Sequence, residues 1–205
     1  MIDFIINTDE FERYKARFHT LFHQKDFEKN PFKDAFKYFA GFEFDFIYHK
    51  SFFEGLKVFL SKIGSEFVTF YTISPPPESY FYRRFEKYSV FEISSLASDS
   101  DLNEIMTKNP DEDSFDSICA SSDEIAWFSE SDNWAILGSR DWEIAIIGFT
   151  DIEVMKKFTL SFREEAQTMF TSIKTQADAL NDMLCFNEQI KADYDKLVDH
   201  YRNKV

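Results

Sequence analysis

The chain has little glycine, proline or cysteine: among its 205 residues there are five glycines, five prolines and two cysteines. Neither a glycine-rich phosphate-binding loop nor a Gly-x-Ser-x-Gly nucleophile turn occurs in it. Cys119 and Cys185 do not have the spacing of a metal-binding or redox pair. We therefore expect two reduced thiols, as in cytosolic proteins, with a single disulfide as the alternative.

The chain also lacks a long apolar run. No stretch reaches the roughly 18 apolar residues that a membrane-spanning helix needs. The first residues, MIDFIINTDEF, have neither the basic start nor the apolar centre of a secretion signal. These absences predict a cytoplasmic protein that does not enter a membrane.

Positive charge is scarce, since 23 Lys and Arg residues stand against 37 Asp and Glu residues and give a net charge of −14. This balance disfavours nucleic acid and anionic membranes as direct ligands. Residues 92–133 hold twelve carboxylates and one cation, Lys108, and therefore about 11 of the 14 net negative charges. A dense field of one sign attracts a cationic partner, so we expect a basic protein as the ligand. A purely solubilising role is the alternative.

Aromatic residues are abundant. Phe occurs 26 times, with 19 of these residues before position 92, and 44% of the chain is apolar. Each buried Phe stabilises a fold by roughly 1.5–3 kcal/mol, so this composition predicts a large core. The length fits a single α+β domain over residues 1–205, with an acidic loop region at about 95–123.

Hydrophobic periodicity predicts the order of helices and strands. In the first half we expect a helix over 11–22 with caps at 7–9, a short helix from Pro31 to Gly41, a strand over 42–48, a helix over 52–63 ended by Gly64, and strands over 67–73 and 88–93.

In the second half we expect a short helix around 102–106, a mobile loop over 111–123, an antiparallel meander over 125–147, a helix of more than 30 residues from an Asp151 cap, and a final helix capped by Asn187. The fold class is therefore α+β, with a central, mostly antiparallel sheet, short N-terminal helices and long C-terminal helices. Trp127, Trp134 and Trp142 all fall in the meander, where we expect core positions rather than exposed binding anchors.

Side chains that could carry catalysis are sparse and dispersed. His19 and His23 are four residues apart on one helical face, but they lack the intervening Glu of a zinc hydrolase. We predict no catalytic residue, no metal and no cofactor. The alternative is an enzyme in which carboxylates meet His49 or His200 only in the folded chain.

The acidic segment supplies the predicted binding surface. The carboxylates expected to contact the partner are Asp101, Glu104, Asp111, Glu112, Asp113 and Asp116. Leu102, Ile105 and Phe115 are interleaved with them, and we expect these three side chains to add apolar anchoring.

Residues 131–145, SDNWAILGSRDWEIA, resemble segments of bacterial immunity proteins from polymorphic toxin systems. The resemblance covers about 20 of the 205 residues and carries over no binding residues. It implies a small, acidic, cytosolic protein without enzymatic activity that binds a cognate toxin, often a nuclease with a cationic active site.

A third alternative is a structural or adaptor protein whose apolar stripe from Met155 to Leu184 forms a dimer seam.

Overall fold

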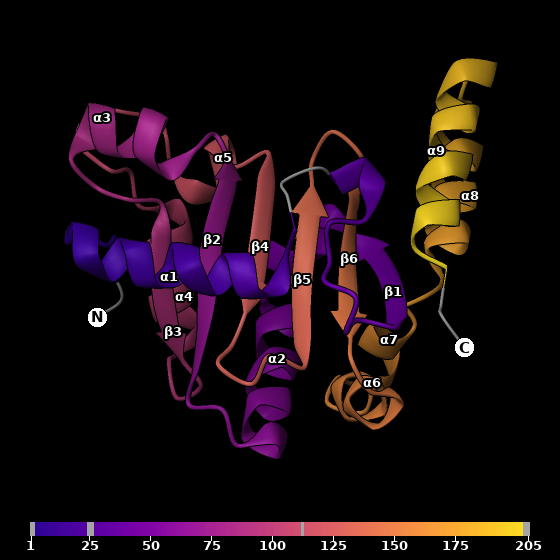
Figure 1. Ribbon diagram of the computed structural model, residues 1–205, viewed down its shortest axis with the longest axis horizontal. Coiled ribbons are helices and arrows are strands. Elements are labelled where there is room, and N and C mark those ends of the chain that lie inside the picture. The colour runs from indigo at the N-terminus through magenta and orange to yellow at the C-terminus, as the bar shows by residue number, and fades with distance from the viewer. Residues whose placement is uncertain (1–2, 24–26, 112, 203–205) are drawn as a thin grey trace.

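The fold is built on one six-stranded antiparallel sheet, as the computed structural model shows for residues 3–23, 27–111 and 113–202 (Figure 1). The strand order is β1-β6-β5-β4-β2-β3. The strands are β1 (Tyr38–Glu43), β2 (Phe67–Ser74), β3 (Val90–Ser94), β4 (Glu124–Phe128), β5 (Trp134–Ser139) and β6 (Ile144–Phe149). This arrangement confirms the α+β class and the antiparallel sheet.

Helices precede, interrupt and follow these strands. They are α1 (Thr8–Leu21), α2 (Lys50–Ile63), α3 (Arg83–Phe85), α4 (Asp99–Thr107), α5 (Ile118–Ser121), α6 (Ile152–Thr159), α7 (Glu164–Gln167), α8 (Ile173–Leu184) and α9 (Glu188–His200). Short 3₁₀ segments occupy Phe27–Lys29 and Phe44–Tyr48, and a π-helical turn occupies Pro77–Tyr82.

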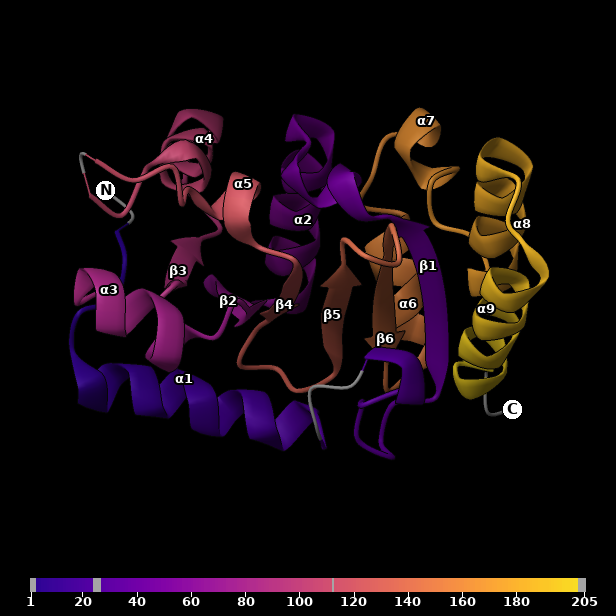
Figure 2. The same ribbon diagram turned by 90° about the horizontal axis from the view of Figure 1, so that it is seen from above.

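Both faces of the sheet are covered by helices, so its side chains are buried on both sides (Figure 2). On one face, called here the α2 face, Phe70, Trp127 and Ile147 pack with side chains of α2, α4 and α6. On the other, the α1 face, Tyr71 and Phe128 pack with α1 and with residues of α8 and α9. The strand residues are therefore almost all buried, and charged side chains are exposed mainly on the helices and connecting segments.

The predicted meander of β4, β5 and β6 is confirmed. Trp127 pairs with Ile136, and Ile136 pairs in turn with Ile147, in a regular antiparallel register. Trp127 and Trp134 are fully buried, and the Trp134 indole N–H donates to Ser129 Oγ across the first turn at 2.9 Å. Trp142 is half-buried against the α1-face cluster. The tryptophans thus serve the core rather than an exposed surface.

Helix boundaries follow the predicted caps in four places. The side chains of Asn7, Asp151 and Asn187 accept backbone N–H groups at the starts of α1, α6 and α9. Gly64 ends α2 with a left-handed φ of 70°, a conformation that glycine adopts without a Cβ clash.

Two predictions between Pro31 and Tyr48 were wrong. Tyr38–Glu43 is an edge strand paired with β6 rather than the end of a helix, and Phe44–Tyr48 is a 3₁₀ segment rather than a strand. The aromatic spacing that suggested a helix instead places Phe32, Phe36 and Phe39 in the α1-face core. Pairing ends at Glu43 because its partner Ile144 is the first residue of β6.

The predicted helix of more than 30 residues is also wrong, because the chain forms α6, α7 and α8 there. Phe158 and Phe162 pack on the α2 face, whereas Ile173 and Leu180 pack on the α1 face. One straight helix cannot reach both sides of a sheet. The chain passes the β1 edge at Thr171, which exchanges two backbone hydrogen bonds with Gly41 of β1, at 2.8 and 3.0 Å.

We predict that Gly55→Ala destabilises the α2 face. A Cβ at position 55 would lie 2.3 Å from Cδ1 of the Phe162 ring, so the ring or the helix must move. The overpacking cost of about 1–3 kcal/mol outweighs the helix-propensity gain of about 1 kcal/mol. Urea unfolding should show a lower midpoint for Gly55→Ala, whereas Ser61→Ala on the exposed side of the same helix should leave it unchanged or slightly higher. An unchanged midpoint for Gly55→Ala would contradict this packing.

Candidate functional site

The carboxylates of residues 92–133 do not all lie on one side of the sheet. Glu92 and Glu130 line a pocket with residues of α1, whereas α4 packs on the α2 face. Figure 2 shows α1 and α4 on opposite sides of the strands. The sequence predicted a single acidic surface, but the carboxylates are divided between the two sides of the sheet. A common binding surface can therefore include only carboxylates that lie on the same side.

Cations from outside the segment neutralise part of its charge. Ion pairs join Asp99 to Lys50 and Lys57 at 3.0 and 3.1 Å, Asp116 to Arg84 at 3.2 Å, and Asp132 to Arg17 at 2.8 Å. Hydrogen bonds from the two lysines lower the pKa of Asp99, which keeps this carboxylate ionised. Paired charges contribute little to an outward field, so these three residues are weak candidates for partner contact.

The capping and packing of helix α4 determine which of its side chains face the solvent. Ser98 caps it and forms a reciprocal capping box with Asp101, whose carboxylate accepts the Ser98 N–H at 2.9 Å and the Ser98 hydroxyl at 2.6 Å. These hydrogen bonds lower the pKa of Asp101. Leu102 and Ile105 are buried in the α2-face core, so they cannot anchor a partner. Glu104 is exposed on the outer side of the helix.

The segment that follows α4 is held by buried residues and exposes its acidic side chains to solvent. Pro110 and Ser114 are buried and hold the chain against the domain, and the Lys87 ammonium donates to the Pro110 carbonyl. Asp111 and Asp113 are exposed, and the Phe115 side chain is 91% exposed. Short helix α5 follows where a mobile loop was predicted.

Nine side chains were predicted to contact or anchor the partner, and two of them, Leu102 and Ile105, are buried. Five of the others are what we call the α4 surface: Asp101, Glu104, Asp111, Asp113 and Phe115. Glu112 lies outside the described residues, and Asp116 faces Arg84 and accepts the Tyr80 hydroxyl at 2.7 Å. Glu104, Asp111 and Asp113 form no ion pair with any described residue. The lysine of the segment, Lys108, is engaged with Asp3 at 3.0 Å. The α4 surface therefore combines unneutralised carboxylates with one exposed aromatic ring.

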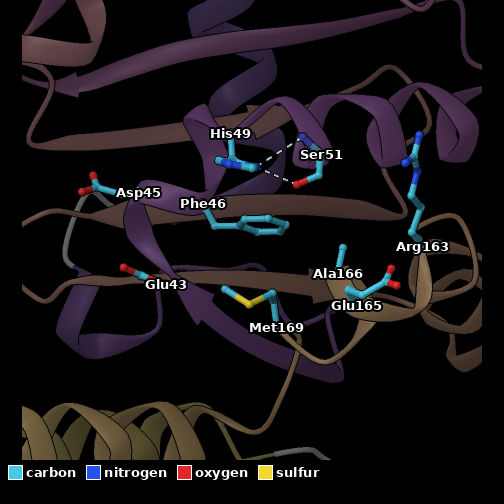
Figure 3. Close-up of a pocket in the computed structure, with 9 residues that line it drawn as sticks. All are labelled: Glu43, Asp45, Phe46, His49, Ser51, Arg163, Glu165, Ala166 and Met169. Carbon is cyan, nitrogen blue, oxygen red and sulfur yellow. Dashed lines mark hydrogen bonds between the residues drawn. The ribbon is translucent and has the colours of Figure 1, made fainter.

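A pocket that sequence reasoning did not find lies between the α2 N-terminus, the end of β1 and α7 (Figure 3). We call it the Phe46 pocket; its volume is about 430 Å³, and its lining is Glu43, Asp45, Phe46, His49, Ser51, Arg163, Glu165, Ala166 and Met169. Two stretches of chain that are far apart in sequence, residues 43–51 and 163–169, contribute to it, so no local motif predicts it. The Phe-x-x-His spacing before a helix was the one usable signal, since His49 caps α2 and stacks near Phe46.

His49 is occupied by this capping role. Its Nδ1 accepts the Ser51 backbone N–H at 3.4 Å and lies 2.7 Å from Ser51 Oγ. No described carboxylate forms a hydrogen bond or ion pair with the His49 ring. In a catalytic triad a third group orients the base, and no described carboxylate has that position relative to His49. His200 is likewise engaged, at 2.6 Å from the Glu28 carbonyl.

A second pocket, of about 610 Å³, lies under α1 and includes Tyr14, Arg13, Glu92 and Glu130. We call it the Glu92 pocket. Burial, and then the nearby carboxylates Glu130 and Glu10, raise the pKa of Glu92, while a hydrogen bond from Tyr14 opposes the shift. This half-buried carboxylate was not singled out from the sequence because α1, far away in the chain, creates its environment.

Metal-binding and membrane-spanning features are not seen in the ranges that the structure describes. Within 3–23, 27–111 and 113–202, no group of three or more His, Cys, Asp or Glu side chains is arranged to hold a metal ion. None of the helices in those ranges has both the length and the apolar character needed to cross a bilayer. Cys119 is half-buried, Cys185 is exposed, and both are free thiols.

No protein-family model, curated protein or solved structure matches this chain. Its function must therefore be inferred from its own residues.

We predict that Glu92→Gln raises stability at neutral pH. Because folding raises the pKa of Glu92, the protonated form is favoured in the fold. The corresponding stability is present below the unfolded pKa of about 4.3 and is lost as pH rises through the folded value. Gln keeps the shape and can still accept from Tyr14, so its melting temperature should exceed that of the wild type at about pH 7.5 and match it near pH 4. The exposed substitution Glu164→Gln should show no such convergence; an equal gap at both pH values would contradict the assignment.

Proposed function

We propose that the protein is a non-catalytic, acidic binding protein of the cytoplasm whose partner is a basic protein. In its most specific form the proposal is an immunity protein that neutralises a basic toxin such as a nuclease. Nucleic acid and membranes are not its ligands, because the net charge of −14 opposes both.

The observation that carries the proposal is the α4 surface. Phe115 is 91% exposed within a stretch whose carboxylates Asp111 and Asp113 have no described ion-pair partner. Large aromatic rings are enriched at the centres of protein interfaces, and complementary charge around them accelerates association. A solubilising surface needs the carboxylates but gains nothing from an exposed ring.

The resemblance to immunity proteins adds support of another kind. Its residues form β5, the turns on either side and the start of β6, and Trp134, Ile136 and Ile144 within them are fully buried. Such residues specify a framework and make no contact with a partner. The proposal that the partner is a toxin therefore rests on the resemblance of these buried residues to immunity proteins and on the negative charge of the chain.

The test is affinity capture from the source organism with wild-type protein and two triple variants. Glu104→Lys/Asp111→Lys/Asp113→Lys reverses the α4 surface, and Asp34→Lys/Asp182→Lys/Asp195→Lys changes the net charge equally at exposed sites elsewhere. We expect wild type and control to retain the same basic protein, and the α4 variant to bind it at least about tenfold more weakly. Retention should fall between about 50 and 500 mM salt because the charges are exposed.

Two outcomes would contradict the proposal. One is that the captured protein is not basic or binds equally at both salt concentrations. The other is that the two triple variants lose binding to the same extent, since the loss would then reflect net charge rather than the α4 surface. For the immunity form, the captured protein should also arrest growth when expressed alone and not when co-expressed with this chain; growth arrest in both cases would contradict it.

A further inference from the structure

The Phe46 pocket has an apolar floor and acidic ends. Figure 3 shows the Phe46 ring between His49 on one side and Ala166 and Met169 on the other. Phe46 and Ala166 are buried, and the Phe46 and His49 rings stack with centroids 6.0 Å apart. The floor therefore offers flat aromatic and thioether contacts to an elongated side chain.

Carboxylates stand at both ends of this floor. Glu43 and Asp45 lie at one end and Glu165 at the other, and all three are exposed (Figure 3). Asp45 has one distant ion pair, 3.6 Å from Arg140, while Glu43 and Glu165 have none with a described residue. In Figure 3 these three carboxylates point away from the Phe46 ring, so the negative charge lies at the rim of an apolar floor. Such a pocket is complementary to a cation that also has an apolar stem.

The one arginine of the pocket lining does not fill this role. Arg163 extends away from Phe46 toward α2, where its guanidinium pairs with Glu54 at 3.2 Å (Figure 3). Glu54 also lies 3.7 Å from Lys50, which pairs with Asp99 of α4 at 3.0 Å. This chain of ion pairs links α7, α2 and α4 along the outer side of the α2 face, so the pocket and the α4 surface belong to the same side of the sheet (Figure 2).

We infer that the Phe46 pocket receives an arginine side chain of the basic partner. The inference rests on the proposed function and specifies which partner group the protein recognises. An arginine stem packs on apolar atoms, its planar guanidinium stacks on aromatic rings, and its five N–H donors can reach a carboxylate in a forked geometry. The lysine ammonium group is compact and strongly hydrated, so it gains less binding energy from contact with the Phe46 and His49 rings.

The test uses N-acetyl-arginine amide as the probe and methyl and amide NMR spectra of the purified protein as the readout. We expect saturable shifts centred on Phe46, His49, Ala166 and Met169, with an affinity in the millimolar range typical of a small fragment. N-acetyl-norleucine amide, which keeps the apolar stem without the guanidinium, should bind about threefold or more weakly.

Two neighbouring residues of α7 provide matched variants. Glu165 lines the pocket and Glu164 does not, although both are exposed. Glu165→Gln and Glu165→Lys should weaken the arginine probe progressively, by about threefold or more for the reversal, and Glu164→Lys should leave its affinity unchanged. Unchanged melting temperatures for the three variants would show that the fold is retained.

The outcomes separate this inference from the proposed function. Equal binding of the arginine and norleucine probes, equal effects of Glu164→Lys and Glu165→Lys, or shifts that never saturate would overturn the pocket assignment. Capture of a basic protein through the α4 surface would survive any of these results. Conversely, a partner that bound wild type and Glu165→Lys equally would overturn the assignment even if the probe entered the pocket.

Discussion

Burial of the sheet on both faces is the constraint on which the rest of the structure depends. Phe70, Trp127 and Ile147 fill one side, and Tyr71 and Phe128 fill the other, so the strands have no free face. An antiparallel sheet usually exposes one side, and its polar positions then carry surface charge. Here the carboxylates have to be carried by helices, strand ends and connections, which explains why the acidic segment is divided between the two sides.

The division decides which carboxylates can act on another molecule. Asp99, Asp116 and Asp132 are held by cations of the same chain, and Glu92 is half-buried beneath α1. The carboxylates of the α4 surface form no such ion pair with a described residue, and neither do Asp123 and Glu130 elsewhere in the segment or Glu43 and Glu165 at the ends of the Phe46 pocket. Helix α4 and this pocket both lie on the α2 side, and exposed ion pairs connect α4, α2 and Arg163 at the start of α7 between them. The α4 surface and the Phe46 pocket are therefore on the same side of the sheet.

The sequence predicted features that depend on short-range patterns. Alternation around Trp127, Trp134 and Ile144 defined the meander, and single capping residues defined several helix starts. The prediction of one long helix over the stripe from Met155 to Leu184 failed. Helical spacing of apolar residues does not show which face of the sheet each residue packs against. Likewise, Leu102 and Ile105 read as interleaved anchors, because only the packing of α4 shows that they face inward. Apart from the Phe-x-x-His spacing before α2, no local pattern indicates the Phe46 pocket, since its walls come from segments more than 100 residues apart.

The central claim is that negative potential is concentrated at the α4 surface, and it can be measured without a partner. Backbone amide relaxation caused by a cationic and by an anionic nitroxide reports the local potential at each residue. We expect amides around Glu104, Asp111 and Phe115 to favour the cationic probe more strongly than exposed amides of α1 and α8, and this preference to shrink as salt shortens the Debye length. A potential that is uniform over the molecule, or strongest around α1, would contradict the account.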